Sequence, residues 1–159
     1  MPERRTGMVG LSQQLVPLGV AFVLSSVIGI EREIRHKVAG LRTHTMVGVG
    51  AAMLMLISKY GFDDILSVGR VVNNPGQLAG QIVTGIGFLG AGIIIVRHDN
   101  PHNVITAASI WIVAAIGMAC GAGLYPIALA GMACDLVTSL VYTPLSEWIR
   151  SRPSPPNRE

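Results

Sequence analysis

The sequence has few charged side chains, few aromatic ones and almost no cysteine. Only 13% of its residues are Asp, Glu, Lys or Arg, where a soluble domain carries about 25%. Two cysteines are too few for a disulfide-rich secreted fold. Aromatic residues make up 5%, and no basic stripe is interleaved with them, which excludes the usual pattern of nucleic-acid-binding proteins. With 50% hydrophobic residues and a mean hydropathy of +0.53, the composition indicates an integral membrane protein.

Five apolar runs are long enough to cross about 30 Å of hydrocarbon, which takes roughly 17–25 helical residues. Because open strands would leave backbone groups unpaired in lipid, every run is predicted to be helical. The expected fold is an all-α integral membrane protein, a bundle of about five transmembrane helices. A four-helix bundle with one pair of runs not fully spanning is the alternative. The predicted parts are an N-terminal segment at 1–10, spans at Leu11–Ile30, Thr43–Tyr60, Ala79–Val96, Val104–Ala122 and Leu124–Thr143, and a cytoplasmic tail at 144–159.

Cationic residues predict how the bundle is oriented, because Lys and Arg accumulate in cytoplasmic loops. Five spans place the first and third connections on the same side as the C-terminus. That side carries eight of the twelve cations, namely Arg32, Arg35, Lys37, Arg42, Arg97, Arg150, Arg152 and Arg158. The other side carries Arg4, Arg5, Lys59 and Arg70. The N-terminus is therefore predicted to lie outside and the C-terminus in the cytoplasm.

A dense group of titratable side chains follows the first span. Glu31–Arg35 and Glu33–Lys37 each place an acid four residues before a base, which is the favourable order on a helix. Ala39-Gly40 is predicted to break this helix. One interpretation is an anchor that binds lipid headgroups. An anchor needs only cations, however, so the two glutamates favour a functional charge cluster, whose predicted members are Glu31, Arg32, Glu33, Arg42, Thr43 and His44. Of these, Thr43 could also cap the second span.

Gly85-Ile86-Gly87-Phe88-Leu89-Gly90 matches the G-x-G-x-x-G pattern of dinucleotide-binding sites. That pattern must follow a strand and meet an acidic residue about 20 positions later, whereas here it lies in a predicted span and the later residue is Ile110. In lipid, glycines let helix backbones approach closely. We interpret the small residues as helix-packing faces, although so dense a run could also bend the helix. The predicted packing positions are Gly85, Gly87, Gly90, Gly92, Gly117 and Gly121.

Asp135 is an acidic residue deep inside the fifth predicted span. A carboxylate there costs roughly 2.5–3.5 kcal/mol on insertion scales, so it should face the bundle and have a partner. The predicted topology offers a buried polar group at similar depth, formed by Ser25, Ser26, Thr106 and Ser109. This group is expected to converge towards Glu31. Asp135 is then either a structural hydrogen-bonded residue or part of a site for protons or cations, with Asp135 and Glu31 as weak candidates for binding Mg²⁺.

The titratable residues do not point to an enzyme. No nucleophile, base and orienting group are spaced for catalysis, and the histidines and cysteines lack the spacing of a metal site. We therefore expect no enzymatic activity and no cofactor other than Mg²⁺.

Three sequence blocks together resemble the membrane domain of the MgtC/SapB family. The first joins Gly29-Ile30-Glu31-Arg32-Glu33 to Ala39-Gly40-Leu41-Arg42-Thr43-His44. The second is Gln81–Gly92, and the third is Thr106-Ala107-Ala108-Ser109-Ile110-Trp111, followed by Gly117 and Gly121. Their order and spacing fit across roughly residues 15–125. Many members also carry a cytosolic C-terminal domain, for which the residues after Thr143 are too few, so the resemblance covers the membrane domain.

The resemblance implies a multi-pass protein of the bacterial inner membrane that is tied to adaptation to low magnesium and, in some pathogens, to virulence. Some members are associated with restraining the F1Fo ATP synthase. The first hypothesis is therefore that the chain adjusts ion or proton balance by regulating such a membrane partner. The second is direct transport of Mg²⁺ or protons, and the third is a structural module that forms a homodimer through its glycine faces.

Overall fold

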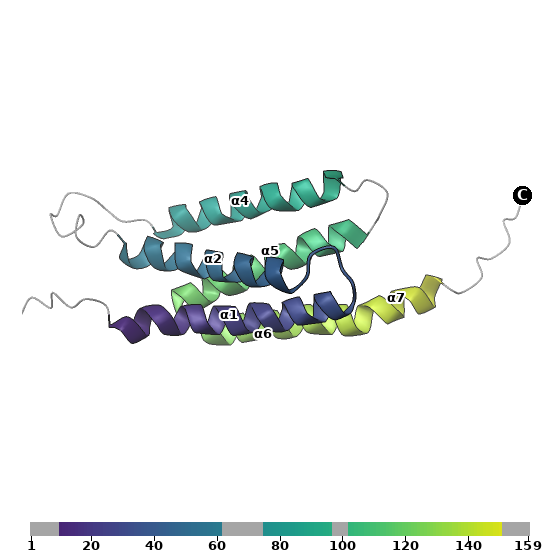
Figure 1. Cartoon of the computed structure of the whole chain (residues 1–159), viewed down its shortest axis with the longest axis horizontal. Helices are drawn as coiled ribbons and strands as arrows, with labels where there is room; N and C mark the ends of the chain where they lie inside the picture. The colour runs from purple at the N-terminus through teal and green to yellow at the C-terminus, as the bar shows by residue number, and fades with distance from the viewer. Residues whose placement is uncertain (1–9, 62–74, 97–101, 151–159) are drawn as a thin grey trace, which may run out of the picture.

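The computed structural model describes residues 10–61, 75–96 and 102–150, and its helices lie roughly along one common axis (Figure 1). Predictions that fall on residues 1–9, 62–74, 97–101 and 151–159 lie outside the described residues. The helices in chain order are α1 (Leu11–Ile34), α2 (Leu41–Tyr60), α4 (Pro75–Val96), α5 (His102–Ala122), α6 (Tyr125–Val137), the π-helical segment η1 (Thr138–Tyr142) and α7 (Thr143–Arg150).

Five helical runs in the described parts of the chain are long and apolar enough to cross a membrane. They are Leu11–Ile34, Leu41–Tyr60, Gly76–Ile95, Val104–Ala122 and Tyr125–Tyr142. This confirms the predicted all-α fold with five spans rather than the four-helix alternative. The first helix continues four residues beyond the predicted span, which adds Glu31–Ile34 to its end. The third begins four residues early at Pro75, because proline fits the first turn of a helix, where its missing N–H is not needed.

The core lies where α1, α2, α5 and α6 meet. Ile28 of α1, Ala52 of α2, Val113 of α5 and Ala128 of α6 are buried there. α4 stands off to one side and packs along α5 and α2 (Figure 1). Only 6% of its span is buried in the chain, compared with 50% for α5.

Small residues let α2 and α5 approach until their backbones touch. A Cβ atom at Gly117 would collide with the carbonyl oxygen of Gly48, and one at Gly121 would lie 2.5 Å from the carbonyl oxygen of Ala52. Helices in lipid associate by such close packing because apolar burial alone does not drive them together. The predicted packing role of Gly117 and Gly121 therefore matches the structure.

Within this chain, the packing role predicted for Gly85, Gly87 and Gly92 of α4 is wrong, whereas Gly90 is buried against α5. Cβ atoms at Gly85, Gly87 and Gly92 would meet nothing within 4 Å, and one at Gly90 would only make ordinary contact with Ala107. The helix is also unbroken from Pro75 to Val96, so the dense glycines do not unwind it. The sequence pattern identified the small residues of α4 correctly but could not show whether another helix of the chain packs against them.

The last two spans form a tight hairpin. Gly123 has a positive φ of 85°, a left-handed conformation that favours glycine. Its N–H donates to the carbonyl of Cys120, and the N–H of Leu124 donates to the carbonyl of Ala119. These bonds satisfy the last carbonyls of α5 before α6 begins.

The fifth span changes helix type near its end. η1 replaces the α-helix just before Pro144, whose ring would otherwise clash with the carbonyl of Leu140 and which has no N–H to donate to it. The wider π-helical turn lets the helix that consists of α6, η1 and α7 continue past the proline. As a result α7 extends to Arg150, so residues 144–150 of the predicted tail are helical.

Candidate functional site

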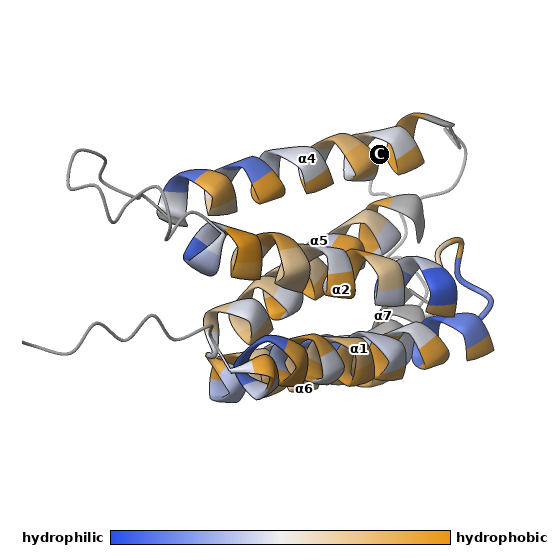
Figure 2. Cartoon of the chain, turned by 60° about the vertical axis from the view of Figure 1, so that its left-hand side comes forward, coloured by the Kyte–Doolittle hydropathy of each residue, from blue (hydrophilic) through white to orange (hydrophobic). Residues whose placement is uncertain are grey.

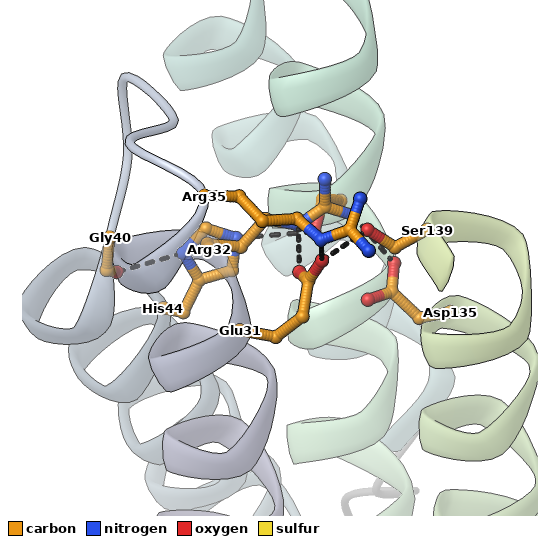
Figure 3. Close-up of polar contacts among 8 residues, drawn as sticks. Glu31, Arg32, Arg35, Gly40, His44, Asp135 and Ser139 are labelled. Carbon is orange, nitrogen blue, oxygen red and sulfur yellow. Dashed lines mark hydrogen bonds and ion pairs between the residues drawn. The ribbon is translucent and has the colours of Figure 1, made fainter. Parts of the chain in front are cut away.

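One end of the bundle carries a buried group of charged side chains. The C-terminal end of α1, the first turn of α2, the first half of α5 and the α6–η1 junction meet there. Figure 3 shows Asp135 and Ser139 on one helical rod, directed towards Glu31, Arg32 and Arg35 of the α1 end. We call Glu31, Arg32, His44, Ser109, Asp135 and Ser139 the buried ion cluster.

Arg32 is the centre of the cluster. Its guanidinium Nη2 donates to Asp135 Oδ1 at 3.4 Å, and its Nε lies 3.4 Å from Glu31 Oε2. The side chains of Arg32 and Asp135 are each only 4% exposed, and that of Glu31 is 10% exposed. Charges so far from water persist only when they are paired, and here one cation is shared by two carboxylates.

Glu31 is held by two further groups. Arg35, one turn later, approaches Glu31 Oε1 to 2.7 Å through its Nε, which confirms the predicted pairing of these residues. The hydroxyl of Ser139 donates to the same oxygen at 2.5 Å. Asp135 and Ser139 are four residues apart on the continuous α6–η1 helix, so this helix contacts the end of α1 at two successive turns.

His44 links α2 to α5 within the cluster and is fully buried. Its Nδ1 lies 2.9 Å from the carbonyl oxygen of Gly40, and its Nε2 lies 3.2 Å from the hydroxyl of Ser109. Because a carbonyl oxygen only accepts, Nδ1 carries the proton, and Nε2 of a neutral ring then accepts from Ser109. His44 also interacts electrostatically with Arg32, Asp135 and Glu31.

Three polar atoms of the cluster have no hydrogen-bond partner among the residues that the structure describes. They are Glu31 Oε2, Arg32 Nε and Asp135 Oδ2. Each buried carboxylate therefore keeps one oxygen that accepts no hydrogen bond from the described residues. Buried polar atoms without a partner are uncommon and often mark sites that bind water or a proton, or that change partner.

The predicted ion pair between Glu33 and Lys37 on a helix is wrong. α1 ends at Ile34, and His36 takes a positive φ of 51°, so Lys37 is outside the helix. Glu33 Oε2 instead accepts the N–H of Leu41 at 2.9 Å and thereby caps α2. A Cβ atom at Gly40 would collide with the carboxylate of Glu33, so only glycine leaves room for this capping contact.

The predicted cap of α2 by Thr43 is also wrong. α2 begins at Leu41, so Thr43 lies inside its first turn. The residue before the helix is Gly40, which has no side chain to form a cap bond.

Only part of the predicted charge cluster is buried. Thr43 and Arg42 are both exposed, whereas Arg32 and His44 are buried. Of the charge cluster predicted from the sequence, the structure therefore brings Glu31, Arg32 and His44 together.

The predicted polar neighbours of Asp135 are only partly gathered around it. Ser109 is buried between His44 and Asp135 and interacts with both. Thr106 is buried one turn before Ser109. Ser26 bonds to Thr45 instead, at 3.0 Å between their hydroxyl oxygens, and Ser25 packs against Gly48 deeper in the bundle.

Two features of the site were missed from the sequence. Ser139 is not among the residues predicted from the sequence, although it lies four residues after Asp135 and therefore shares its helix face. The pairing of Asp135 with Arg32 was missed as well, because Arg32 was expected to lie beyond the span. Extending the first helix to Ile34 would have placed Arg32 one turn after Ile28, on the buried face.

The chain belongs to the MgtC family. The model of that family matches residues 18–148, which includes every residue of the buried ion cluster. The chain is 45% identical over 132 residues to a protein of Escherichia coli K12 named "Putative magnesium transporter YhiD". It is 42% identical over 128 residues to Protein MgtC of Brucella abortus strain 2308, and 37% identical over 139 residues to Protein MgtC of Salmonella typhimurium strain 14028s.

These matches cover 80–87% of this chain but only 50–61% of the relatives. The chain thus spans about half to three fifths of the length of the curated relatives it matches. No solved structure matches the chain. Family membership and the five spans together make it a multi-pass membrane protein.

Proposed function

We propose that this chain is a protein of the bacterial inner membrane that serves adaptation to low magnesium by regulating a membrane partner. The magnesium link rests on the family and on relatives named MgtC and magnesium transporter at 37–45% identity. By the same resemblance, the F1Fo ATP synthase is the first partner to test. The proposed action is to adjust ion or proton balance through that partner rather than to catalyse a reaction.

The observation that supports regulation over transport is the position of Arg32. A cation would need Glu31 and Asp135 as ligands, and both carboxylates are held by the same guanidinium. Mg²⁺ also prefers several oxygen ligands in octahedral geometry. Within the described ranges, no three His, Cys, Asp or Glu side chains are grouped closely enough to hold a metal ion.

The unpartnered oxygens of Glu31 and Asp135 favour the second candidate, direct transport of Mg²⁺ or protons. Each buried carboxylate keeps one oxygen free to receive a proton or a cation if the Arg32 pairing breaks. The two functions differ in whether the purified chain moves ions by itself.

A flux assay on the purified chain in liposomes separates them. Under the regulatory function, neither Mg²⁺ nor protons cross faster than in empty liposomes, for the wild type or for Asp135→Asn. The same substitution should weaken co-purification of a partner from detergent-solubilised membranes. Gln13→Ala, an exposed change at the opposite end of the bundle, is the matched control. Flux by the wild type that Asp135→Asn abolishes would replace regulation with transport.

A further inference from the structure

The first half of the outward face of α4 carries polar residues where a lipid-facing helix would carry large apolar ones. Six exposed residues lie on this face, spaced by 4, 3, 4, 3 and 4 positions: Gln77, Gln81, Thr84, Phe88, Ala91 and Ile95. We call them the α4 outer stripe. The spacing is that of the two core positions in a heptad repeat, the pattern by which one helix packs along another.

Most of the stripe points away from the rest of the chain, and Gln81 lies at its edge, beside the groove between α4 and α2. Among the α4 residues whose burial the structure describes, Ile82 and Gly90 are buried, and Ile86 and Ile93 are half-buried on the same side. A residue two positions later is turned by about 200°, so Thr84 and Phe88 lie opposite Ile82 and Ile86. Phe88 is 80% exposed, more than the other large apolar residues that remain uncovered. Figure 2 shows hydrophilic stretches in the first half of α4, on the helix that stands off from the bundle.

Lipid is a poor occupant for this face. Gln81 is the seventh residue of α4, about 9 Å along the helix from Pro75, and its amide carries two donors and an acceptor. Such groups in spanning helices act as hydrogen-bonding contacts between helices rather than as lipid-facing surface. Gly80 flanks the stripe with open space beside it, so a second helix can approach the backbone closely there.

We infer that the α4 outer stripe binds the same stripe of a second copy of this chain. All copies insert into the membrane with one orientation, so two α4 helices meet in parallel and each residue faces its own counterpart across a two-fold axis. The stripe suits this self-pairing because it carries no charge. A Gln amide both donates to and accepts from an identical amide, and the hydroxyl of Thr84, which already donates to the carbonyl of Gly80, still accepts.

This interface does not depend on the proposed regulatory function. The α4 outer stripe lies outside the buried ion cluster and on a different helix, so the pairing and the role of Asp135 can fail separately. The pairing would leave the α1–α2–α5–α6 core as it is and add a contact along the helix that the chain itself buries least.

Cysteine cross-linking in native membranes tests the inference. The two native cysteines are replaced first (Cys120→Ala and Cys134→Ser), and the parent is checked for a single size-exclusion peak. Oxidation should then give disulfide-linked dimers from Gln81→Cys, Thr84→Cys and Phe88→Cys. Val83→Cys and Leu89→Cys, exposed on the flanks of the same helix, should give little. Equal yields at all five positions, no dimer at any, or a link to a different protein would each overturn the pairing.

A second measurement asks whether the polar contact itself matters. Energy transfer between labelled copies in liposomes gives the dimer fraction at several protein-to-lipid ratios. Gln81→Leu keeps the volume but removes the amide, and it should weaken association roughly three- to tenfold for each hydrogen bond lost. Val83→Leu on the flank should leave association unchanged. If Gln81→Leu associates as strongly as the wild type, the amide does not hold two copies together.

Discussion

Arg32 is the residue on which the candidate site depends. Its side chain is buried at the C-terminal end of α1, where the partial negative charge of the helix end also favours a cation. Two carboxylates, one from its own helix and one from α6, converge on it. The energetic value of such a group is asymmetric. A buried ion pair adds little net stability, but removing one partner leaves the other charge unpaired and costs far more.

Arg32→Met tests this asymmetry. The substitution keeps most of the apolar stem and removes the guanidinium, so Glu31 and Asp135 lose the cation between them. We expect the free energy of unfolding in detergent to fall by about 3–5 kcal/mol. Arg42→Met, on an exposed side chain, should change it by no more than about 0.5 kcal/mol. Equal stability of the two variants would mean that Arg32 is not the cation on which the cluster depends.

At the scale of helices, the site is positioned by two close contacts. The close contact of α2 with α5 holds Gly48 against Gly117 and Ala52 against Gly121. It sets the distance between His44, one turn before Gly48, and Ser109, two turns before Gly117. Glu33 caps the start of α2 and so connects α1 to α2. Asp135 and Ser139 then join the fifth span to the end of α1.

Gly117→Ala probes the seam between α2 and α5. The added methyl group would collide with the backbone oxygen of Gly48, which cannot move aside as a flexible side chain could. Overpacking of this kind typically costs about 1–3 kcal/mol, measured as a lower thermal unfolding midpoint in detergent. Gly50→Ala is the matched control on α2, because a Cβ atom there meets nothing within 4 Å. A Gly117→Ala protein as stable as Gly50→Ala would show that the helices are less tightly apposed.

At the scale of the whole molecule, the distribution of cations assigns a side to the buried ion cluster. The eight-to-four excess of Lys and Arg predicts that the end carrying Arg32, Arg35 and Arg42 faces the cytoplasm. The cluster would then be next to the cytoplasm, where a soluble part of a partner complex can reach it. This orientation remains a prediction.

Labelling with a membrane-impermeant maleimide checks the orientation. In the cysteine-free background, Gln13→Cys near the start of α1 should react in intact spheroplasts. Arg42→Cys at the opposite end should react only after the membrane is permeabilised. Both positions are exposed, so access to the reagent rather than burial decides the result. The reverse labelling pattern would invert the topology and place the buried ion cluster on the outside.

Hydropathy and charge in the sequence were enough to determine the five spans and the two regions from which the site is built. The physical reason is local: lipid requires a helix wherever about 20 apolar residues follow one another, and any charge in such a run is conspicuous. The pair Glu31–Arg35 could also be predicted, because residues four apart on a helix are neighbours.

The partners across the bundle were decided only by the tertiary structure. Nothing in the sequence says that Arg32 of the first helix meets Asp135 of the fifth, since 103 residues separate them and their contact depends on how the helices rotate as they pack. Rotation also decides that Gly117 is buried against α2 while Gly87 faces open space, although both look alike as small residues in a span. Local pattern fixes which residues are helical, and the packing of neighbouring helices selects which faces meet.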